Sequence, residues 1–131
     1  ATFASFGLAG FERSRAYELS GGMRQRVAFL RTLLSGKPVL CLDEPFGALD
    51  ALTRAEMRDW LAAALEREPR TVLLVTHDVE EACVLADRVL VLSPRPARVA
   101  ATIEVPLPRP RRVTDQALVA LRERALEALA A

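Results

Sequence analysis

Two apolar runs in this sequence end at side chains that can take part in chemistry. The run that begins at Val39 ends at Asp43 and Glu44, and a later run ends at His77. An aspartate at such a position supplies a hard oxygen ligand for Mg²⁺. A neighbouring glutamate can orient or deprotonate an attacking water, and an imidazole can donate a hydrogen bond to a phosphate oxygen. These residue types predict phosphoryl-transfer chemistry, against the plainer alternatives of a solvated turn and a structural histidine.

A third candidate group is a serine followed by two glycines at the start of a helical pattern. Ser20 precedes Gly21 and Gly22, and the helix pattern begins at Met23. Glycines leave the first backbone N–H groups bare at the positive end of the helix dipole, which is an anion site suited to a phosphate. An ordinary helix cap with flexible glycines is the alternative.

The elements that must position these residues alternate between strands and helices. Continuous apolarity predicts strands that are covered on both faces, as in a parallel sheet, and the long crossover between the first two strands predicts that they are parallel. Ligands of such sheets bind at the carboxyl ends of the strands, so Asp43, Glu44 and His77 are expected to converge on one edge. The predicted elements are a helix over Met23–Leu34, a strand over Val39–Leu42, a helix from Asp50 to about Glu66, a strand over Thr71–Thr76, a helix from Asp78 to about Ala86, and a strand over Arg88–Leu92.

Sequence texture changes after Ser93. A further strand is expected over 97–105, then a solvated Pro/Arg connector over 106–112, and a closing helix over 114–131. Asp78 and Glu81 make a start like a capping box. The apolar faces predicted for the three long helices are Met23, Val27, Leu30 and Leu34 for the first, Leu52, Met57, Trp60, Leu61 and Leu65 for the second, and Leu118, Leu121, Ala125 and Leu129 for the last.

Composition excludes several classes of protein. The 131 residues are 51% hydrophobic and 27% charged, a composition typical of a globular protein. The length of the chain predicts one domain. A net charge of +1 provides no overall field for nucleic acid. Cys41 and Cys83 are expected to be buried thiols of a reduced compartment. The start at Ala1 lacks a signal-peptide pattern and an initiator Met, which favours a cut chain.

Four short motifs in order resemble those of the ATP-binding cassette (ABC) ATPases. Each lies at the start or the end of one of the elements above, and the spacing between them fits the family. The motifs are Leu19-Ser20-Gly21-Gly22-Met23, which is similar to the signature motif, Val39 to Glu44, which resembles Walker B, Gly47-Ala48-Leu49-Asp50, which resembles the D-loop, and Thr76-His77-Asp78, which resembles the H-loop.

The resemblance implies an α/β fold with part of a P-loop NTPase (RecA-like) parallel sheet and flanking helices. It also implies that the chain begins late in the ABC helical subdomain. Residues 1–36 are expected to hold the end of that subdomain, with the signature motif and the following helix. Residues 37–93 are expected to hold the RecA-like core, and residues 94–131 the C-terminal strand, connector and helix.

The resemblance also implies roles for the motif residues, in a head-to-tail dimer of two ATPase subunits that encloses two ATP molecules. Glu44 is the expected general base and His77 steadies the γ-phosphate, while Asp43 holds Mg²⁺ directly or through water. The signature residues touch the partner's ATP, and the D-loop couples the two sites. The signature residues are Ser20, Gly21, Gly22 and Met23, and the D-loop residues are Ala48, Leu49 and Asp50.

A phosphate-cradling Walker A loop is missing from this sequence. Such a loop needs Gly-x-x-x-x-Gly-Lys followed by Ser or Thr. Lys37 is the only lysine, Pro38 follows it, and Arg31 stands where the first glycine belongs. The chain is therefore expected to resemble only the C-terminal half of the nucleotide-binding domain, and alone not to bind ATP tightly or turn it over. Without the P-loop strand and its neighbours, strands such as Val39–Leu42 are expected to be partly uncovered.

The leading functional hypothesis is the ATPase subunit of an ABC importer, cytoplasmic and held on the inner membrane face by a permease. A substrate-binding protein would be an indirect partner, and no nucleic acid is expected. The signature variant Ser-Gly-Gly-Met-Arg-Gln-Arg, with Met23 where the family commonly has Gln, resembles that of the group that imports nitrate, sulfonate or taurine. One alternative is a non-transport ABC ATPase, but the span from Leu19 to Leu92 has no coiled-coil or zinc insert. The other is a non-catalytic, truncated protein.

Overall fold

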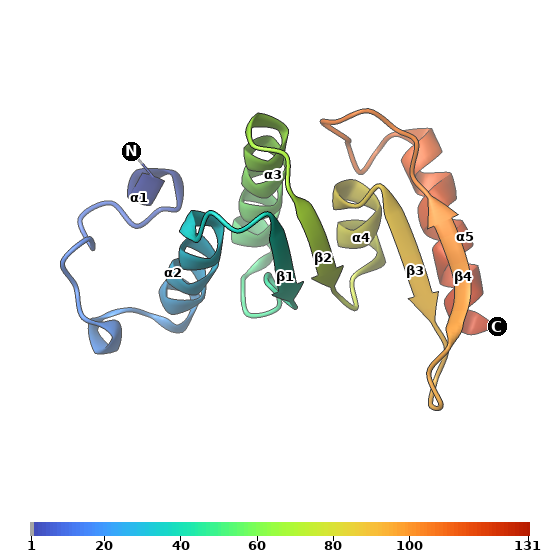
Figure 1. Ribbon diagram of the computed structural model, residues 1–131, viewed down its shortest axis with the longest axis horizontal. Coiled ribbons are helices and arrows are strands. Elements are labelled where there is room, and N and C mark those ends of the chain that lie inside the picture. The colour runs from blue at the N-terminus through green and yellow to red at the C-terminus, as the bar shows by residue number, and fades with distance from the viewer. Residues whose placement is uncertain (1) are drawn as a thin grey trace. The chain divides into compact units, whose positions relative to one another are not determined.

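The computed structural model describes residues 2–131, which form two compact units that meet in sequence between Val75 and Thr76. Figure 1 shows the helices and strands of both units. Each unit has strands and helices of its own, and each is described separately below. The three-part division at residues 36 and 93 remains a prediction from the motifs.

The first unit contains two parallel strands joined by a long helix. Strands β1 and β2 pair in parallel, with Val39 opposite Thr71 and Asp43 opposite Val75, and they run side by side in Figure 1. This confirms the predicted parallel strands with a helical crossover. The elements of this unit are α1 (Thr2–Ser5), a short 3-10 turn (Ala16–Glu18), α2 (Gly21–Leu34), β1 (Val39–Asp43), α3 (Ala51–Arg67) and β2 (Thr71–Val75).

Side-chain caps begin the two long helices of this unit. Ser20 Oγ accepts a hydrogen bond from Met23 N at 3.2 Å, as its predicted capping role requires. Asp50 Oδ1 accepts one from Thr53 N at 3.0 Å. Hydrogen bonds from Thr53 lower the pKa of the Asp50 carboxyl below its ordinary value. The predicted caps are therefore confirmed, although α2 begins at Gly21 and not at the predicted Met23.

An aromatic cluster forms much of the core of the first unit. The ring of Phe6 lies 6.1 Å from that of Phe29 and 4.0 Å from that of Trp60. The ring of Phe29 is also 5.7 Å from that of Phe46. Through these edge-to-face contacts, Phe29 becomes part of the buried face of α2. The predicted helix faces are therefore partly wrong: Phe29 and Leu33 are buried, while Leu34 and Leu52 are exposed.

Strand β1 is covered on one face and open on the other. Leu40 and Leu42 are buried, whereas Val39 is 54% exposed and Cys41 is also exposed. A strand of this apolar type is covered on both faces in a complete parallel sheet, but in half of such a domain it is expected to be partly uncovered, and β1 is. The expected burial of Cys41 is wrong. Side chains alternate across a strand, and the described helices cover only the face of Leu40.

The second unit is an antiparallel strand pair packed against helices. Strands β3 and β4 pair with Arg88 opposite Glu104, and α5 contacts both strands and α4 (Figure 1). Cys83 is buried in this core as predicted, whereas Leu129 is exposed. The elements are α4 (Val79–Leu85), β3 (Arg88–Leu92), β4 (Val99–Glu104) and α5 (Gln116–Ala130). The core residues are Cys83, Val84, Val91, Ile103, Val105, Leu118, Leu121 and Ala125.

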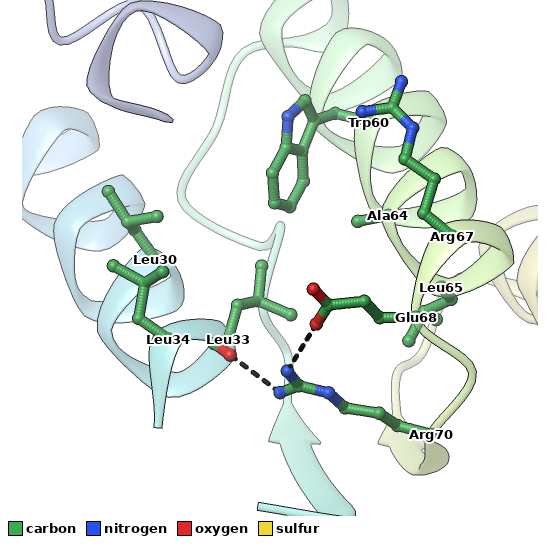
Figure 2. A pocket seen from close by; sticks show the side chains of 9 residues that line it. All are labelled: Leu30, Leu33, Leu34, Trp60, Ala64, Leu65, Arg67, Glu68 and Arg70. Carbon is green, nitrogen blue, oxygen red and sulfur yellow. Dashed lines mark hydrogen bonds and ion pairs between the residues drawn. The ribbon is translucent and has the colours of Figure 1, made fainter. Parts of the chain in front are cut away.

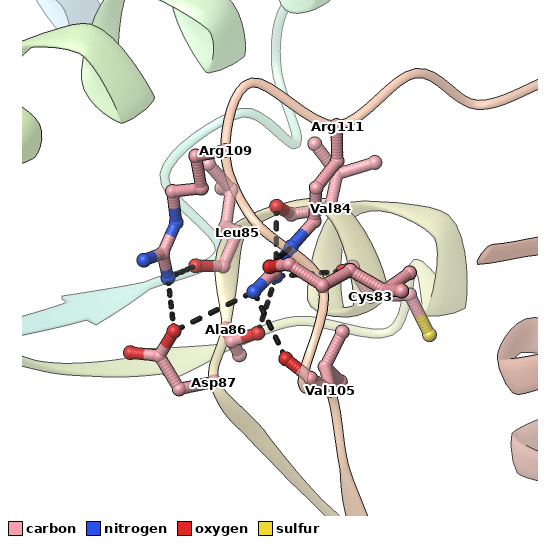
Figure 3. Close-up of polar contacts among 9 residues, drawn as sticks. Cys83, Val84, Leu85, Ala86, Asp87, Val105, Arg109 and Arg111 are labelled. Carbon is pink, nitrogen blue, oxygen red and sulfur yellow. Dashed lines mark hydrogen bonds and ion pairs between the residues drawn. The ribbon is translucent and has the colours of Figure 1, made fainter. Parts of the chain in front are cut away.

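The Pro/Arg connector is partly buried, which corrects the expectation of a solvated segment. The Arg111 side chain is 1% exposed, and its guanidinium donates to the carbonyl oxygens of Ala86 at 2.6 Å and Val105 at 3.1 Å (Figure 3). It also donates to Cys83 O and Val84 O in the last turn of α4. Burial lowers the pKa of Arg111 below its usual range. The connector is thus tied to α4 by charge-assisted hydrogen bonds.

Within residues 2–131, none of the helices combines the length and the apolarity that a membrane span requires.

Candidate functional site

The predicted catalytic carboxylates lie at the carboxyl end of β1. Asp43 is the last residue of the strand and is exposed. Glu44 follows it in a tight turn, and its backbone N–H donates to Val75 O at 2.8 Å. The side chains therefore stand at the strand edge where open parallel sheets bind ligands.

The backbone at Glu44 is strained. Its φ is +45°, the left-handed region that non-glycine residues rarely adopt. Gly47 N donates to Glu44 O at 3.2 Å and closes the turn. Such outliers persist where the surroundings over-determine them, and they cluster at functional sites. The strained residue, Glu44, is thus the one that the sequence predicts as the general base.

The glycines of the predicted signature motif occupy the first two positions of α2. N–H groups at these positions have no acceptor within a helix. A Cβ atom added at Gly21 would meet nothing within 4 Å, so neighbouring atoms of the described chain do not require a glycine there. A glycine at this position would allow a ligand to approach the backbone closely.

The predicted D-loop packs against the signature motif in the first unit. A Cβ at Gly22 would lie 3.8 Å from Leu49 Cδ2, and Leu49 is buried. Ala48 beside it is exposed, and Asp50 uses its carboxylate to cap α3. The structure therefore brings Gly22 of the signature motif and Leu49 of the D-loop together. Met23, half-buried, takes part through its backbone N–H to Ser20.

In the second unit, His77 lies in a turn held by hydrogen bonds on both sides. Thr76 Oγ1 accepts from Asp78 N at 3.0 Å and donates to Glu81 Oε2 at 2.8 Å. Asp78 Oδ1 accepts from Glu81 N at 3.1 Å. The predicted capping box is thus present with its return bond routed through the Thr76 hydroxyl, and it leaves His77 exposed.

An open hollow of about 430 Å³ lies beside this turn in the second unit. It combines the imidazole with charged groups of α4 and α5, among which Glu80 pairs with Arg122 at 3.3 Å. Its lining residues are His77, Asp78, Val79, Glu80, Arg122 and Leu126. Because His77 and Glu44 belong to different units, their convergence on one edge remains a prediction.

A smaller pocket of about 270 Å³ lies between α2 and the end of α3, away from these motifs (Figure 2). Arg70 crosses its floor, donating to Leu33 O at 2.7 Å and to Glu68 Oε2 at 2.9 Å. Leu30, Leu34 and Trp60 supply apolar walls. Since none of the predicted site residues lines it, this pocket has no part in the candidate site.

Asp43 is the carboxylate of the candidate site that stands in a position to bind a metal ion. Among residues 2–131 no three His, Cys, Asp or Glu side chains gather as a metal cluster. Asp43 nevertheless fits a Mg²⁺ ion of the kind that takes one or two carboxylates together with substrate phosphates. Its side chain is exposed at the end of the strand and, unlike those of Asp50 and Asp78, does not cap a helix.

Two residues at or behind the site, Gln25 and Arg111, were missed by sequence reasoning, whereas Glu81 was predicted as part of the helix start after His77. Gln25 Nε2 donates to Pro45 O at 2.9 Å and to Glu44 O at 3.4 Å. Glu81 buries its carboxylate against Thr76, and Arg111 caps the helix that follows His77. Gln25 lies four residues after Gly21 and therefore on the same face of α2, and this spacing could have marked it as a residue near the site. Nothing in the sequence distinguishes Arg111 from its neighbour Arg112.

Comparisons with known proteins agree with these motifs. The family model described as ABC transporter matches residues 1–47. The "Aliphatic sulfonates import ATP-binding protein SsuB 1" of Rhodococcus jostii is 54% identical over 123 residues, which are 94% of this chain and 49% of that protein. The "Formylaminopyrimidine import ATP-binding protein ThiZ" of Halalkalibacterium halodurans is 49% identical over 104 residues, 79% of this chain and 42% of that protein. The chain spans about half the length of the curated relatives it matches.

A solved structure supports the fold. An inward-facing metal-chelate type ABC transporter matches with a TM-score of 0.63 at 24% sequence identity. The match covers 92% of this chain and 46% of that one. The chain therefore shares its α/β fold with part of that structure.

Proposed function

Because this chain belongs to the family of ABC transporter ATP-binding proteins, we propose that the protein carrying it hydrolyses ATP to drive import of a solute. The observation that carries this proposal is a juxtaposition in the first unit. The bare helix start, at which Gly22 packs beside Leu49, lies in the same unit as the strained turn at Glu44. One unit thereby offers an anion site and a carboxylate that can serve as a base.

The proposed mechanism divides the work between the motifs. Glu44 accepts the proton of the water that attacks the γ-phosphate, and His77 donates a hydrogen bond to that phosphate. Gly21 and Gly22 N–H groups stabilise negative charge on the ATP held by a partner subunit. Asp43 would hold Mg²⁺, which neutralises phosphate charge when bound.

Partners and location follow from this role. A second ATPase subunit completes each site from across a head-to-tail interface, with the D-loop residues Ala48, Leu49 and Asp50 at the contact. A membrane permease binds the pair at the cytoplasmic face, and a substrate-binding protein delivers the solute to it. A sulfonate is the proposed solute, because the Rhodococcus relative is named for aliphatic sulfonates and covers 94% of this chain. Uptake of a labelled alkanesulfonate by the complete transporter tests this proposal. Uptake of a formylaminopyrimidine without uptake of the alkanesulfonate would contradict it.

Glu44→Gln tests the proposed reaction. In a protein of the relatives' length that carries these residues and a Walker A loop, ATP turnover is expected to fall by at least about 100-fold. Binding of a fluorescent ATP analogue should change little, because the amide keeps the shape of the side chain. Glu66→Gln, on the exposed face of α3, is the matched control. Turnover like that of the unchanged protein would remove Glu44 from the mechanism.

A further inference from the structure

The turn at Glu44 holds a conformation that its own sequence opposes. A Cβ atom disfavours the observed φ of +45°. Pro45 follows, and residues before proline prefer extended backbone. Hydrogen bonds to Val75 and Gly47 restrain the two sides of the turn, at 2.8 and 3.2 Å. The carboxylate can keep this orientation only while neighbouring groups hold the turn in place.

Gln25 supplies a hold from another element. Its side-chain N–H₂ group donates to Pro45 O at 2.9 Å and, over a longer 3.4 Å, to Glu44 O. Both contacts are partly buried, where hydrogen bonds are less exposed to competition from water. Because Pro45 has no backbone N–H, its carbonyl oxygen is the backbone group through which a neighbouring side chain can form a hydrogen bond with it.

Position on α2 gives this contact a second consequence. Gln25 lies four residues after Gly21 and three after Gly22, so the three residues share one face of the helix. Its amide therefore joins the helix start that offers bare N–H groups to the turn that carries the carboxylate.

We propose that Gln25 is a positioning residue for Glu44, and that it couples the signature helix to the catalytic turn within one chain. This inference rests on the proposed function, since it takes Glu44 as the general base. A phosphate that displaces the start of α2 would then alter the orientation of the carboxylate through the Gln25 amide. The two sites that one subunit serves, its own and its partner's, are linked by this side chain.

Amide hydrogen exchange in the 131-residue chain tests the contact without nucleotide. Gln25→Met keeps the length of the side chain but removes the N–H donors, and Gln25→Glu keeps the shape and also removes them. Exchange of the Glu44 and Gly47 amides is expected to quicken about fivefold in both variants, the scale of one lost hydrogen bond. The Met57 amide inside α3 should keep its rate. Arg31→Met, on the exposed face of α2, should change neither.

A kinetic readout separates positioning from general stability. In the Walker A-containing protein, Gln25→Met should lower kcat about tenfold and leave the KM for ATP within about twofold, because binding energy is retained while the base is misplaced. Unchanged exchange at Glu44 and Gly47, or faster exchange that includes Met57, would overturn the inference. Absence of turnover in the unchanged protein, with the exchange effect present, would instead overturn the proposed function.

Discussion

At the scale of single residues, two adjacent glutamates on the first turn of α4 do different work. Glu81 is 4% exposed and accepts a hydrogen bond from the Thr76 hydroxyl at 2.8 Å. Glu80 pairs with Arg122 at 3.3 Å, with both side chains more than a third exposed. A buried carboxylate costs free energy unless it is paired or hydrogen-bonded, so the bond to Thr76 helps fix the turn that carries His77.

Alanine substitution at these neighbouring positions distinguishes the two roles. Glu81→Ala is expected to lower the free energy of unfolding by about 1–3 kcal/mol, because the partly buried Thr76 hydroxyl loses its acceptor. Glu80→Ala should cost less than about 1 kcal/mol, as exposed ion pairs do. Chemical denaturation measures both, and the NMR signal of His77, the single histidine, reports the turn. Equal losses from the two variants would show that burial of Glu81 has no energetic consequence.

At the scale of elements, α4 is a short helix that is secured at both ends. It has seven residues, too few to be stable by propensity alone. Asp78 caps its start, and Arg111 binds the carbonyl oxygens at its end, which helices leave without internal partners. Figure 3 shows Arg109 beside Arg111, with Asp87 bonded to the guanidinium groups of both. The connector is therefore a clamp on the helix that follows His77.

Consecutive arginines in the connector provide the test. Arg111→Met should destabilise the fold by about 3 kcal/mol or more, because it leaves several buried carbonyl oxygens without a donor. Arg112→Met, at an exposed position one residue later, should stay within about 0.5 kcal/mol. Urea denaturation followed by circular dichroism gives the comparison. A small loss for Arg111→Met would mean that water replaces the guanidinium.

At the scale of the whole molecule, the β1–β2 pair of the first unit leaves one apolar face open. Val39, Leu73 and Val75 are each more than half exposed, and Cys41 lies among them in the strand register. Contiguous exposed apolar side chains mark a surface that contacts something else. The relatives are about twice as long as this chain, and in a protein of their length we expect this face to be covered.

Thiol labelling tests that exposure directly. In the 131-residue chain Cys41 should react with a maleimide, whereas Cys83 should stay unmodified until the protein is unfolded. Cys83 is fully buried, and burial raises the pKa of its thiol, which lowers the thiolate fraction. Cys41→Ser and Cys83→Ser identify the labelled site by mass. Labelling of both cysteines at one rate would contradict the described burial. Fast labelling of Cys41 in a protein of the relatives' length would show that the face stays open.

Local chemistry explains which elements the sequence predicts well. Ser20, Asp50 and Asp78 begin helices because their side chains bond the nearby backbone, and such bonds span only a few residues. Parallel pairing of the first two strands follows from the length of the crossover at α3. The candidate site residues at the ends of these elements could therefore be named in advance, before any tertiary contact was known.

By itself, then, the amino-acid sequence determined the order of elements, the caps and the motif residues, since each depends on neighbours in the chain. Tertiary structure alone decided the rest: the bond from Gln25 to Pro45, the burial of Arg111 beside exposed Arg112, and the exposure of Cys41 within an apolar strand. These depend on groups far apart in sequence, or on which face of a strand is covered. A pattern of apolar and polar residues records that a side chain can be buried, but only packing decides what it meets.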